Sequence, residues 1–156
     1  MILGLDLSLT ATGVVVIDGQ GAVVDSYTVG EKLSRKARQK DKIERILDIC
    51  KRVCSTVTEH KVKKIGIEGF AFQARGAQND LGELHGVVKS QIWLAFGIEP
   101  IIIPPTSARK RALGSGKIKK KEVINSLTKL GYECNDHNQA DALVIALAVL
   151  SEGEVE

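Results

Sequence analysis

The chain has 156 residues, of which 44% are hydrophobic and 26% charged, so it is neither a disordered chain nor a coiled-coil rod. This length predicts one domain over residues 1–150, followed by an acidic and frayed tail over residues 151–156. The chain has no run of twenty apolar residues and no leader-like start, so we expect a cytoplasmic protein with no membrane-spanning segment.

Charge is unevenly distributed along the chain. The net charge is +3, but residues 109–121, here called the basic segment, carry +7 and leave −4 for the rest. The cations of the basic segment are Arg109, Lys110, Arg111, Lys117, Lys119, Lys120 and Lys121. Such a concentration of positive charge predicts a patch for an anionic polymer or a membrane surface rather than a generally basic protein.

Three short apolar runs open the chain, at residues 2–7, 13–17 and 22–27, and turn residues separate them. Their spacing predicts an antiparallel meander of three strands. Residues 31–42 are charged and have few apolar anchors, so we expect a loop or the solvated start of a helix. From Ile43 to Val57, apolar residues recur at the three-and-four spacing of an amphipathic helix.

The three cysteines form neither a disulfide framework nor a Cys-x-x-Cys metal pair. Cys50 and Cys54 lie on the apolar stripe of the helix that ends near Val57. Both are therefore interpreted as core residues rather than as metal ligands or redox centres.

The second half of the chain alternates strands and helices around an expected flexible run at residues 70–77. The predicted elements are strands at residues 64–68 and 98–103, and helices at residues 79–96, from a Thr106 cap to about Leu113, at residues 119–130 and at residues 136–150. Asp136 and Gln139 have the spacing of a capping box. This order predicts an α/β fold, with a mixed five-stranded sheet and helices on both faces.

The helix at residues 79–96 carries a face of small residues, Gly82, Gly86 and Ser90, beside the large side chain of Trp93. Small residues permit another helix to approach closely. This face is therefore the predicted contact with a second subunit.

Three acidic residues stand among apolar residues, where a carboxylate is costly to bury without a compensating cation or donor. Asp6 lies in the first strand, Glu68 ends the fourth strand and Asp141 lies near the start of the last helix. If the first and fourth strands are neighbours, the three acids converge at one edge of the sheet. Converging carboxylates repel one another, and a hard divalent cation is the usual compensation. Beside the basic segment, such a site suits phosphodiester hydrolysis.

Each acid also has a purely structural interpretation. Asp6 could cap the turn that follows it, and Asp141 could complement the dipole of its helix. Glu68 could form an ion pair with Lys64 or Arg75. Together, and next to the basic segment, the three acids favour the metal site.

Four stretches of the chain match the motifs of a known family, and they occur in the same order. They are Gly4-Leu5-Asp6-Leu7-Ser8-Leu9-Thr10-Ala11-Thr12-Gly13, Ile67-Glu68-Gly69-Phe70, Pro105-Thr106-Ser107 with the basic segment, and Ala140-Asp141-Ala142-Leu143. Over almost the whole chain they resemble the RuvC family of Holliday junction resolvases, and the short chain is similar to phage-encoded members. The resemblance implies a ribonuclease H-like fold, a homodimer and paired nicks across a four-way DNA junction. It also implies Mg²⁺ or Mn²⁺, with two ions per active site.

The resemblance gives the catalytic and metal-binding roles to Asp6, Glu68 and Asp141. The family usually has a fourth ligand, Asp or His, three residues before the last acid, and this chain has Asn138 there. His137 precedes it and lies on a neighbouring part of the same helical face. Either residue is therefore a candidate for the fourth ligand.

The resemblance also implies DNA contacts. An aromatic residue in the loop after the fourth strand looks like a stacking partner for bases, which makes Phe70 and Phe72 candidates. Core packing is the alternative for both. Lys120, and Arg109 or Lys110, resemble phosphate contacts of the family, and the remaining cations of the basic segment are expected to add to them. A solvated face is the alternative for any one of these cations.

Three other interpretations compete with a junction resolvase. A strand, an Asp and a Thr-rich turn also open the sugar-kinase and actin-like ATPases, but those need a second domain and a second glycine-rich loop. A ribonuclease H-like nuclease could act on structured RNA instead. A module that binds branched DNA without cleaving it is the third, and the intact set of three acids argues against it.

Overall fold

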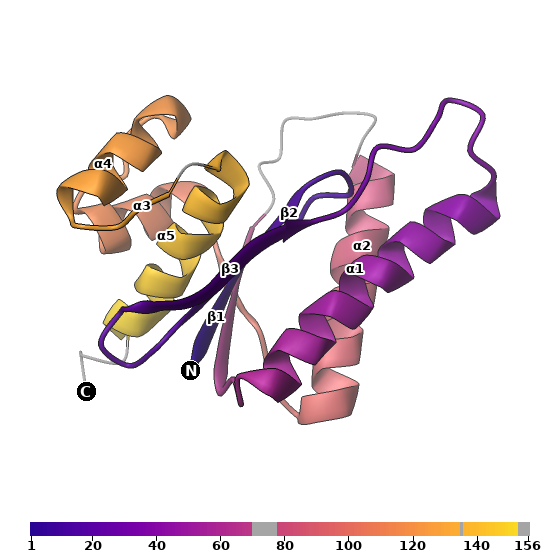
Figure 1. Cartoon of the computed structure of the whole chain (residues 1–156), viewed down its shortest axis with the longest axis horizontal. Coiled ribbons are helices and arrows are strands. Elements are labelled where there is room, and N and C mark those ends of the chain that lie inside the picture. Colours follow the sequence, from indigo (N-terminus) through magenta and orange to yellow (C-terminus); the bar gives the residue numbers. More distant parts are fainter. Residues whose placement is uncertain (70–77, 135, 153–156) are drawn as a thin grey trace.

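The computed structural model describes residues 1–69, 78–134 and 136–152 (Figure 1). Its strands are β1 (Ile2–Asp6), β2 (Thr12–Ile17), β3 (Val23–Val29), β4 (Lys64–Glu68) and β5 (Ile101–Ile103). Its helices are α1 (Gln39–Glu59), α2 (Gln78–Phe96), α3 (Pro105–Leu113), the 3₁₀ turn η1 (Lys120–Glu122), α4 (Val123–Lys129) and α5 (His137–Glu152). None of the helices in these described ranges is both long and apolar enough to cross a membrane.

The five strands form one mixed sheet in the order β3-β2-β1-β4-β5. β1, β2 and β3 pair antiparallel, as the meander prediction requires. β4 pairs parallel to β1 and β5 parallel to β4. Helices α1 and α2 cover one face, and α3, α4 and α5 cover the other (Figure 1). The predicted fold class is confirmed.

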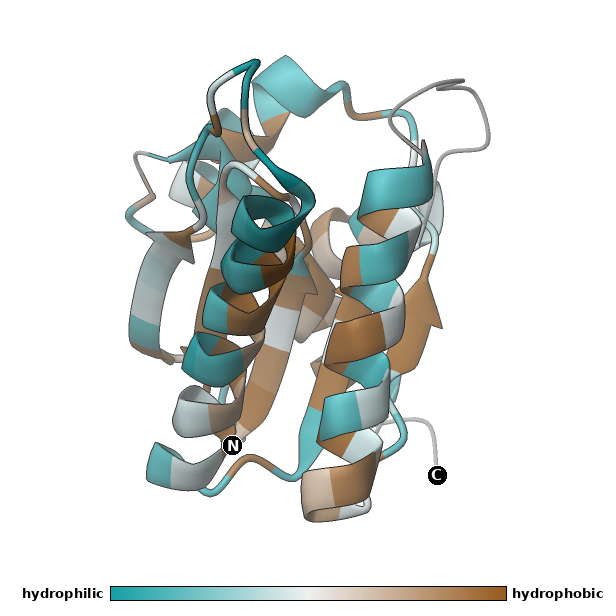
Figure 2. Ribbon diagram, turned by 90° about the vertical axis from the view of Figure 1, so that its right-hand side faces the viewer, coloured by the Kyte–Doolittle hydropathy of each residue, from teal (hydrophilic) through white to brown (hydrophobic). Residues whose placement is uncertain are grey.

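Alternation along the strands produces two hydrophobic cores, one on each face of the sheet. Leu3 and Leu5 of β1 pack with α1 and α2, whereas Ile2 packs with α5. Figure 2 shows the hydrophobic strands behind α1 and α2. Cys50 is buried in the α1 core and Cys54 packs against it, which confirms their interpretation as core residues.

Two glycines let α5 lie directly on the backbone of the sheet. A Cβ at Gly4 would lie 2.0 Å from the carbonyl oxygen of Ala142, and a Cβ at Gly13 would lie 2.0 Å from that of Asn138. Real Cβ atoms do not approach so closely, so any larger residue must move α5. The position of this helix over β1 and β2 therefore depends on Gly4 and Gly13.

Several element boundaries differ from the predicted ones. The strand predicted at residues 98–103 is paired from Ile101 onward, and Pro100 before it has no N–H to donate to a neighbouring strand. Thr106 is not the cap of α3: the helix begins at Pro105, whose fixed φ suits the first helical position, and Pro104 is its N-cap. The linker between α3 and η1 folds back onto α3, because Gly116 packs against the carbonyl of Thr106.

The last two helices also depart from their predicted limits. The helix predicted at residues 119–130 is split into η1 and α4, and the Glu122 carboxylate accepts a hydrogen bond from the Lys119 N–H at the start of η1. α5 continues to Glu152, where an ion pair with Arg111 of α3 holds its last turn. Residues 151 and 152 of the predicted tail are therefore helical, and residues 153–156 lie outside the described residues, so the frayed tail stays a prediction there.

Candidate active site

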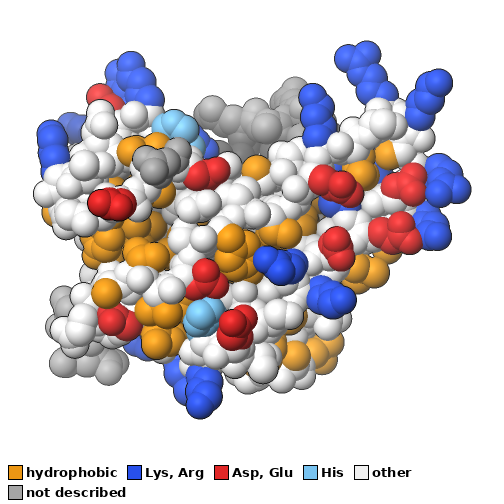
Figure 3. Space-filling view, viewed as in Figure 1, with side chains coloured by type: hydrophobic (Ala, Val, Ile, Leu, Met, Phe, Trp, Pro, Cys, Tyr) orange, Lys and Arg blue, Asp and Glu red, His pale blue; other side chains and the backbone are white. Residues whose placement is uncertain are grey.

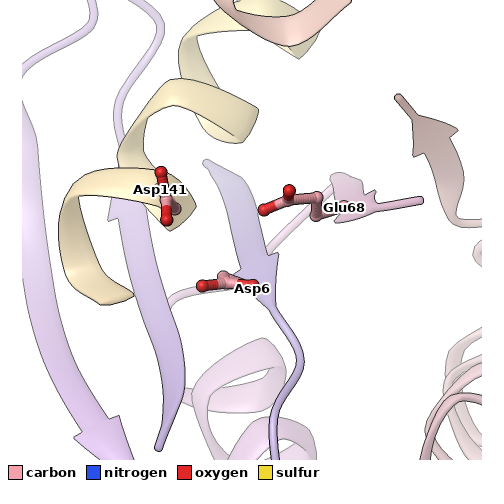
Figure 4. Close-up of side chains that lie close together, drawn as sticks. All are labelled: Asp6, Glu68 and Asp141. Atoms are coloured by element: carbon pink, nitrogen blue, oxygen red, sulfur yellow. The ribbon is translucent and has the colours of Figure 1, made fainter. Parts of the chain in front are cut away.

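Three elements bring the predicted acids together at one edge of the sheet. Asp6 ends β1 and Glu68 ends β4, and because these strands are parallel neighbours their carboxyl ends meet. Asp141 lies in the second turn of α5, which crosses above them (Figure 4). One carboxylate oxygen of each residue lies within 4.8 Å of those of the other two. We call these three residues the acid cluster.

The acid cluster is partly removed from water. Asp141 is 6% exposed, and Asp6 and Glu68 are half-buried. Burial, followed by the charge of Asp141, raises the pKa of Asp6 to about 6. Burial, followed by the charges of Asp6 and Asp141, raises the pKa of Glu68 to about 8. The cluster therefore holds a proton near neutral pH when nothing else balances its charge.

Lys120 from η1 supplies part of that balance. Its Nζ lies 2.8 Å from Oδ2 of Asp141, although 61% of the lysine side chain is exposed. Burial acts to lower the pKa of Lys120, but the hydrogen bond and charge of Asp141, with the other two acids, raise it overall. The Lys120 ammonium group thus lies beside the acid cluster, and its exposed side chain is able to turn toward solvent.

The start of α5 is fixed by polar contacts that place Asp141. The Asp136 carboxylate accepts hydrogen bonds from the N–H groups of Asn138 (2.7 Å) and Gln139 (3.0 Å), and these bonds lower its pKa. This confirms Asp136 as the cap. The Gln139 side chain reaches β3 instead of closing a capping box: Ser26 donates to its Oε1 at 2.6 Å, and it donates to Thr28 at 3.3 Å.

The two candidates for a fourth ligand lie on the first turn of α5. His137 is exposed and Asn138 is half-buried. The group of His, Cys, Asp and Glu side chains that can share an ion consists, among the described residues, of the acid cluster without His137. Asn138 stands one turn before Asp141 on the same helical face.

The structural interpretations of the acids find little support. The turn after Asp6 is closed by its own residues, since Thr12 Oγ1 accepts from the Ser8 N–H and donates to the Ser8 carbonyl. Glu68 and Lys64 sit at opposite ends of β4, and Arg75 lies outside the described residues. Asp141 is buried and bonded to Lys120 rather than standing in the exposed first turn of its helix.

The basic segment is not uniform. Arg109 donates to the Ile118 carbonyl at 3.2 Å and Arg111 forms the ion pair with Glu152, so both have structural partners. Lys120 faces the acid cluster. The remaining four side chains are exposed, and they are Lys110, Lys117, Lys119 and Lys121. Phe70 and Phe72 lie outside the described residues, so their predicted stacking role stays a prediction.

Sequence reasoning missed two features that hold the site together. Gly4 and Gly13 were not recognised as the points where α5 touches the sheet, and Gln139 was assigned to a cap although it binds β3. A glycine inside an apolar strand is a signal for close backbone approach, so the first feature was detectable. The second depends on the pairing of Gln139 with residues more than one hundred positions away.

The mixed sheet carries carboxylates at the ends of β1 and β4, α5 adds a third carboxylate, and Lys120 lies beside them. This arrangement defines a nuclease of the ribonuclease H-like class. The family model described as crossover junction endodeoxyribonuclease RuvC matches residues 2–149. The chain belongs to the RuvC family, whose members are divalent-metal-dependent junction endonucleases.

Solved structures are similar in fold. A structure of Thermus thermophilus RuvC matches with a TM-score of 0.77 and 24% identity, over 98% of this chain and 95% of that one. T. thermophilus RuvC in complex with Holliday junction substrate matches with a TM-score of 0.79 and 22% identity, over 98% and 94%. Fowlpox virus resolvase in complex with Holliday junction DNA matches with a TM-score of 0.55 and 11% identity, over 97% and 99%. No curated protein sequence matches this chain significantly.

Proposed function

We propose that this protein resolves Holliday junctions by hydrolysing phosphodiester bonds at the acid cluster, with Asp6, Glu68 and Asp141 as the catalytic residues. The observation that carries the proposal is the convergence of three carboxylates from β1, β4 and α5 within 4.8 Å, in a chain of the RuvC family. The products expected from the family are paired nicks, placed symmetrically across a four-way junction.

The donor set fits Mg²⁺ or Mn²⁺. All three side chains offer carboxylate oxygens, which hard divalent cations prefer. Because the three carboxylates are buried close together, their negative charges repel one another and favour a bound cation. We propose two ions per active site, with His137 or Asn138 completing the second. Divalent ions in such a pair activate water and stabilise the leaving oxygen.

The residues of this chain prepare the site for those ions. Asp6 and Glu68 stand on neighbouring strands, so the sheet fixes the separation of their carboxylates. Glu68 releases the proton that its raised pKa retains near neutral pH. Lys120 leaves Oδ2 of Asp141, and its exposed side chain turns to the phosphate that is to be cleaved. Lys110, Lys117, Lys119 and Lys121 bind neighbouring phosphates as exposed cations.

We further propose that two copies assemble through α2. Trp93 is 57% exposed and Leu94 75%, on a helix whose Gly82 and Gly86 have open space in front of them. Ile102 of the edge strand β5 adds further exposed apolar surface, at 48%. Large exposed apolar side chains next to small residues favour a close helix contact. A two-fold axis through α2 presents two active sites to two strands of one junction.

A panel of nucleic acids tests the proposed function. The purified protein is incubated with Mg²⁺ and a four-way DNA junction, a fork, a plain duplex and a structured RNA, each labelled on one strand. We expect nicks in the junction at symmetric positions and little cleavage of the duplex. Faster cleavage of the RNA would make the protein a structure-selective ribonuclease, and junction binding without nicks would make it a binding module.

A further inference from the structure

A second concentration of positive charge stands on the other side of the acid cluster from the basic segment. Residues 31–38, which join β3 to α1, are here called the arm. From residue 32 to residue 38 the arm has four cations and no acid: Lys32, Arg35, Lys36 and Arg38. Figure 3 shows Lys and Arg gathered at the upper left, over the α3–α4 region, and again at the upper right, over the arm and the start of α1.

The register of the sheet places the start of the arm at the edge of the sheet that carries the acid cluster. Asp6 pairs with Gly13 of β2, and Gly13 pairs with Thr28 near the end of β3. The chain therefore leaves β3 at the same edge of the sheet that carries the acid cluster. Gly30, with a φ of +123°, packs against the turn that follows Asp6: a Cβ there would lie 3.0 Å from the Leu9 carbonyl oxygen.

The arm is held in place at both ends. Arg45 of α1 donates to the Glu31 carbonyl at 3.2 Å. At the other end, the Arg38 N–H donates to the Asp41 carboxylate at 2.7 Å, which caps α1. Between them, Ser34 closes a turn, because its hydroxyl accepts from the Lys36 N–H at 3.1 Å. The arm therefore presents its cations from a fixed turn rather than from a free chain.

Three of these cations are not neutralised by nearby acids. Lys32, Arg35 and Lys36 are exposed, and no carboxylate in the described parts of the chain lies within ion-pair distance of them. The next cations along the chain differ: Lys40 pairs with Glu44 at 3.4 Å, and Lys42 with Asp80 of α2 at 3.5 Å. The unpaired cations of the arm are therefore followed along the chain by two paired ones, Lys40 and Lys42.

The two basic regions lie on opposite faces of one sheet. The basic segment belongs to the α3, α4 and α5 layer, whereas the arm leads into the α1 and α2 layer (Figure 1). We propose that the arm is a second phosphate-binding surface, which contacts the backbone of a DNA duplex on the α1 side of the acid cluster while the basic segment contacts it on the α5 side. This inference rests on the proposed function and adds the arm residues to its DNA-binding surface.

Salt-dependent binding tests the arm. The triple variant K32Q/R35Q/K36Q is compared with the wild type and with a control, K61N/K63Q/K64Q, which removes three exposed cations at the far end of β4. Asn is used at Lys61 because the φ there is +50°, which Asn tolerates. Binding to a labelled four-way junction is measured by anisotropy in EDTA over a range of salt concentrations, and thermal melting confirms that both variants fold.

If all three cations contact phosphate, the slope of log K against log salt flattens by about 2.7 in the arm variant. Between about 50 and 200 mM salt, the arm variant then loses roughly 40-fold less affinity than the wild type. The control keeps the wild-type slope. Equal slopes in the arm variant and the control overturn the inference. The proposed function fails on a different result, namely the absence of junction nicking by the wild type in Mg²⁺.

Discussion

The acid cluster and the basic segment lie side by side, yet they are built in opposite ways. Each acid comes from a different element, and the sheet and α5 fix all three positions. The seven cations come from thirteen consecutive residues, but they face three environments: the structural partners of Arg109 and Arg111, the acids beside Lys120, and solvent. Closeness in sequence therefore predicts charge, and the fold decides what each charge does.

The largest expected effect comes from a substitution that disturbs the acid cluster, whose residues the sheet and α5 hold in place. In Gly13→Ala the new Cβ meets the Asn138 carbonyl, so α5 must move and Asp141 with it. We expect a loss of about 3 kcal/mol in the free energy of unfolding, together with loss of nicking. Gly19→Ala is the matched control, because nothing lies within 4 Å of a Cβ there. Urea denaturation measures both, and equal stability of the two variants would contradict the close contact.

The second prediction separates neighbours within the basic segment. Lys120→Ala removes the cation bound to Asp141 and is expected to slow nicking at saturating DNA by at least about tenfold, or roughly 1.4 kcal/mol in the barrier. Lys121→Ala removes an exposed cation and is expected to weaken junction binding most at low salt, and less as salt rises, with little change in that rate. Single-turnover kinetics at several salt concentrations distinguish the two effects. Matching rates in both variants would show that Lys120 is only another surface charge.

The third prediction concerns the raised pKa of Glu68, about 8 against an ordinary value of 4.5. Between these values the folded state binds more protons than the unfolded state, so the stability of the metal-free protein falls as pH rises from 4.5 to 8. Glu68→Gln lacks this cost. We expect it to be more stable than the wild type by about 2 kcal/mol at pH 8 in EDTA, and by much less at pH 5. A stability difference that does not change with pH would contradict the burial of charge in the cluster.

The smallest expected effect lies at the edge of the site. A neutral fourth ligand adds no negative charge, so the second ion is expected to require more Mg²⁺ than an Asp would, and Mn²⁺ to restore activity. If His137 is the ligand, His137→Ala loses activity at limiting Mg²⁺ and Asn138→Ala retains it; if Asn138 is the ligand, the pattern reverses. Asn138→Asp then lowers the Mg²⁺ requirement. Full activity in both alanine variants would show that the three carboxylates suffice.

Much of the fold was predictable because local pattern and final burial agree. The alternation at β1 and β2 and the apolar stripe of α1 led directly to the observed elements. The convergence of Asp6, Glu68 and Asp141 was predictable because an acid among apolar residues needs a partner, and parallel neighbouring strands bring their ends together. That prediction assumed that the first and fourth strands are neighbours, and the observed strand order confirms it.

The rest was not accessible because it depends on long-range contacts. The basic segment gave no local sign that Arg111 binds Glu152 or that Lys120 reaches Asp141. The charge of residues 31–42 predicts only a loop or the solvated start of a helix, whereas the position of the arm at the edge of the sheet that carries the acid cluster depends on the register of β3. The start of α3 also differed, because the fixed φ of Pro105 suits the first helical position and the helix begins there, one residue before Thr106.

The most direct test of the acid cluster is a comparison of nicking and binding in Glu68→Gln. Gln keeps the size of the side chain and removes one carboxylate of the acid cluster, while every cation of the basic segment remains. We expect Mg²⁺-dependent nicking of a four-way junction to be abolished and junction affinity in EDTA to stay within about threefold of the wild type, less than about 0.7 kcal/mol. Nicking near the wild-type rate by Glu68→Gln would contradict the assignment of the acid cluster as the catalytic centre.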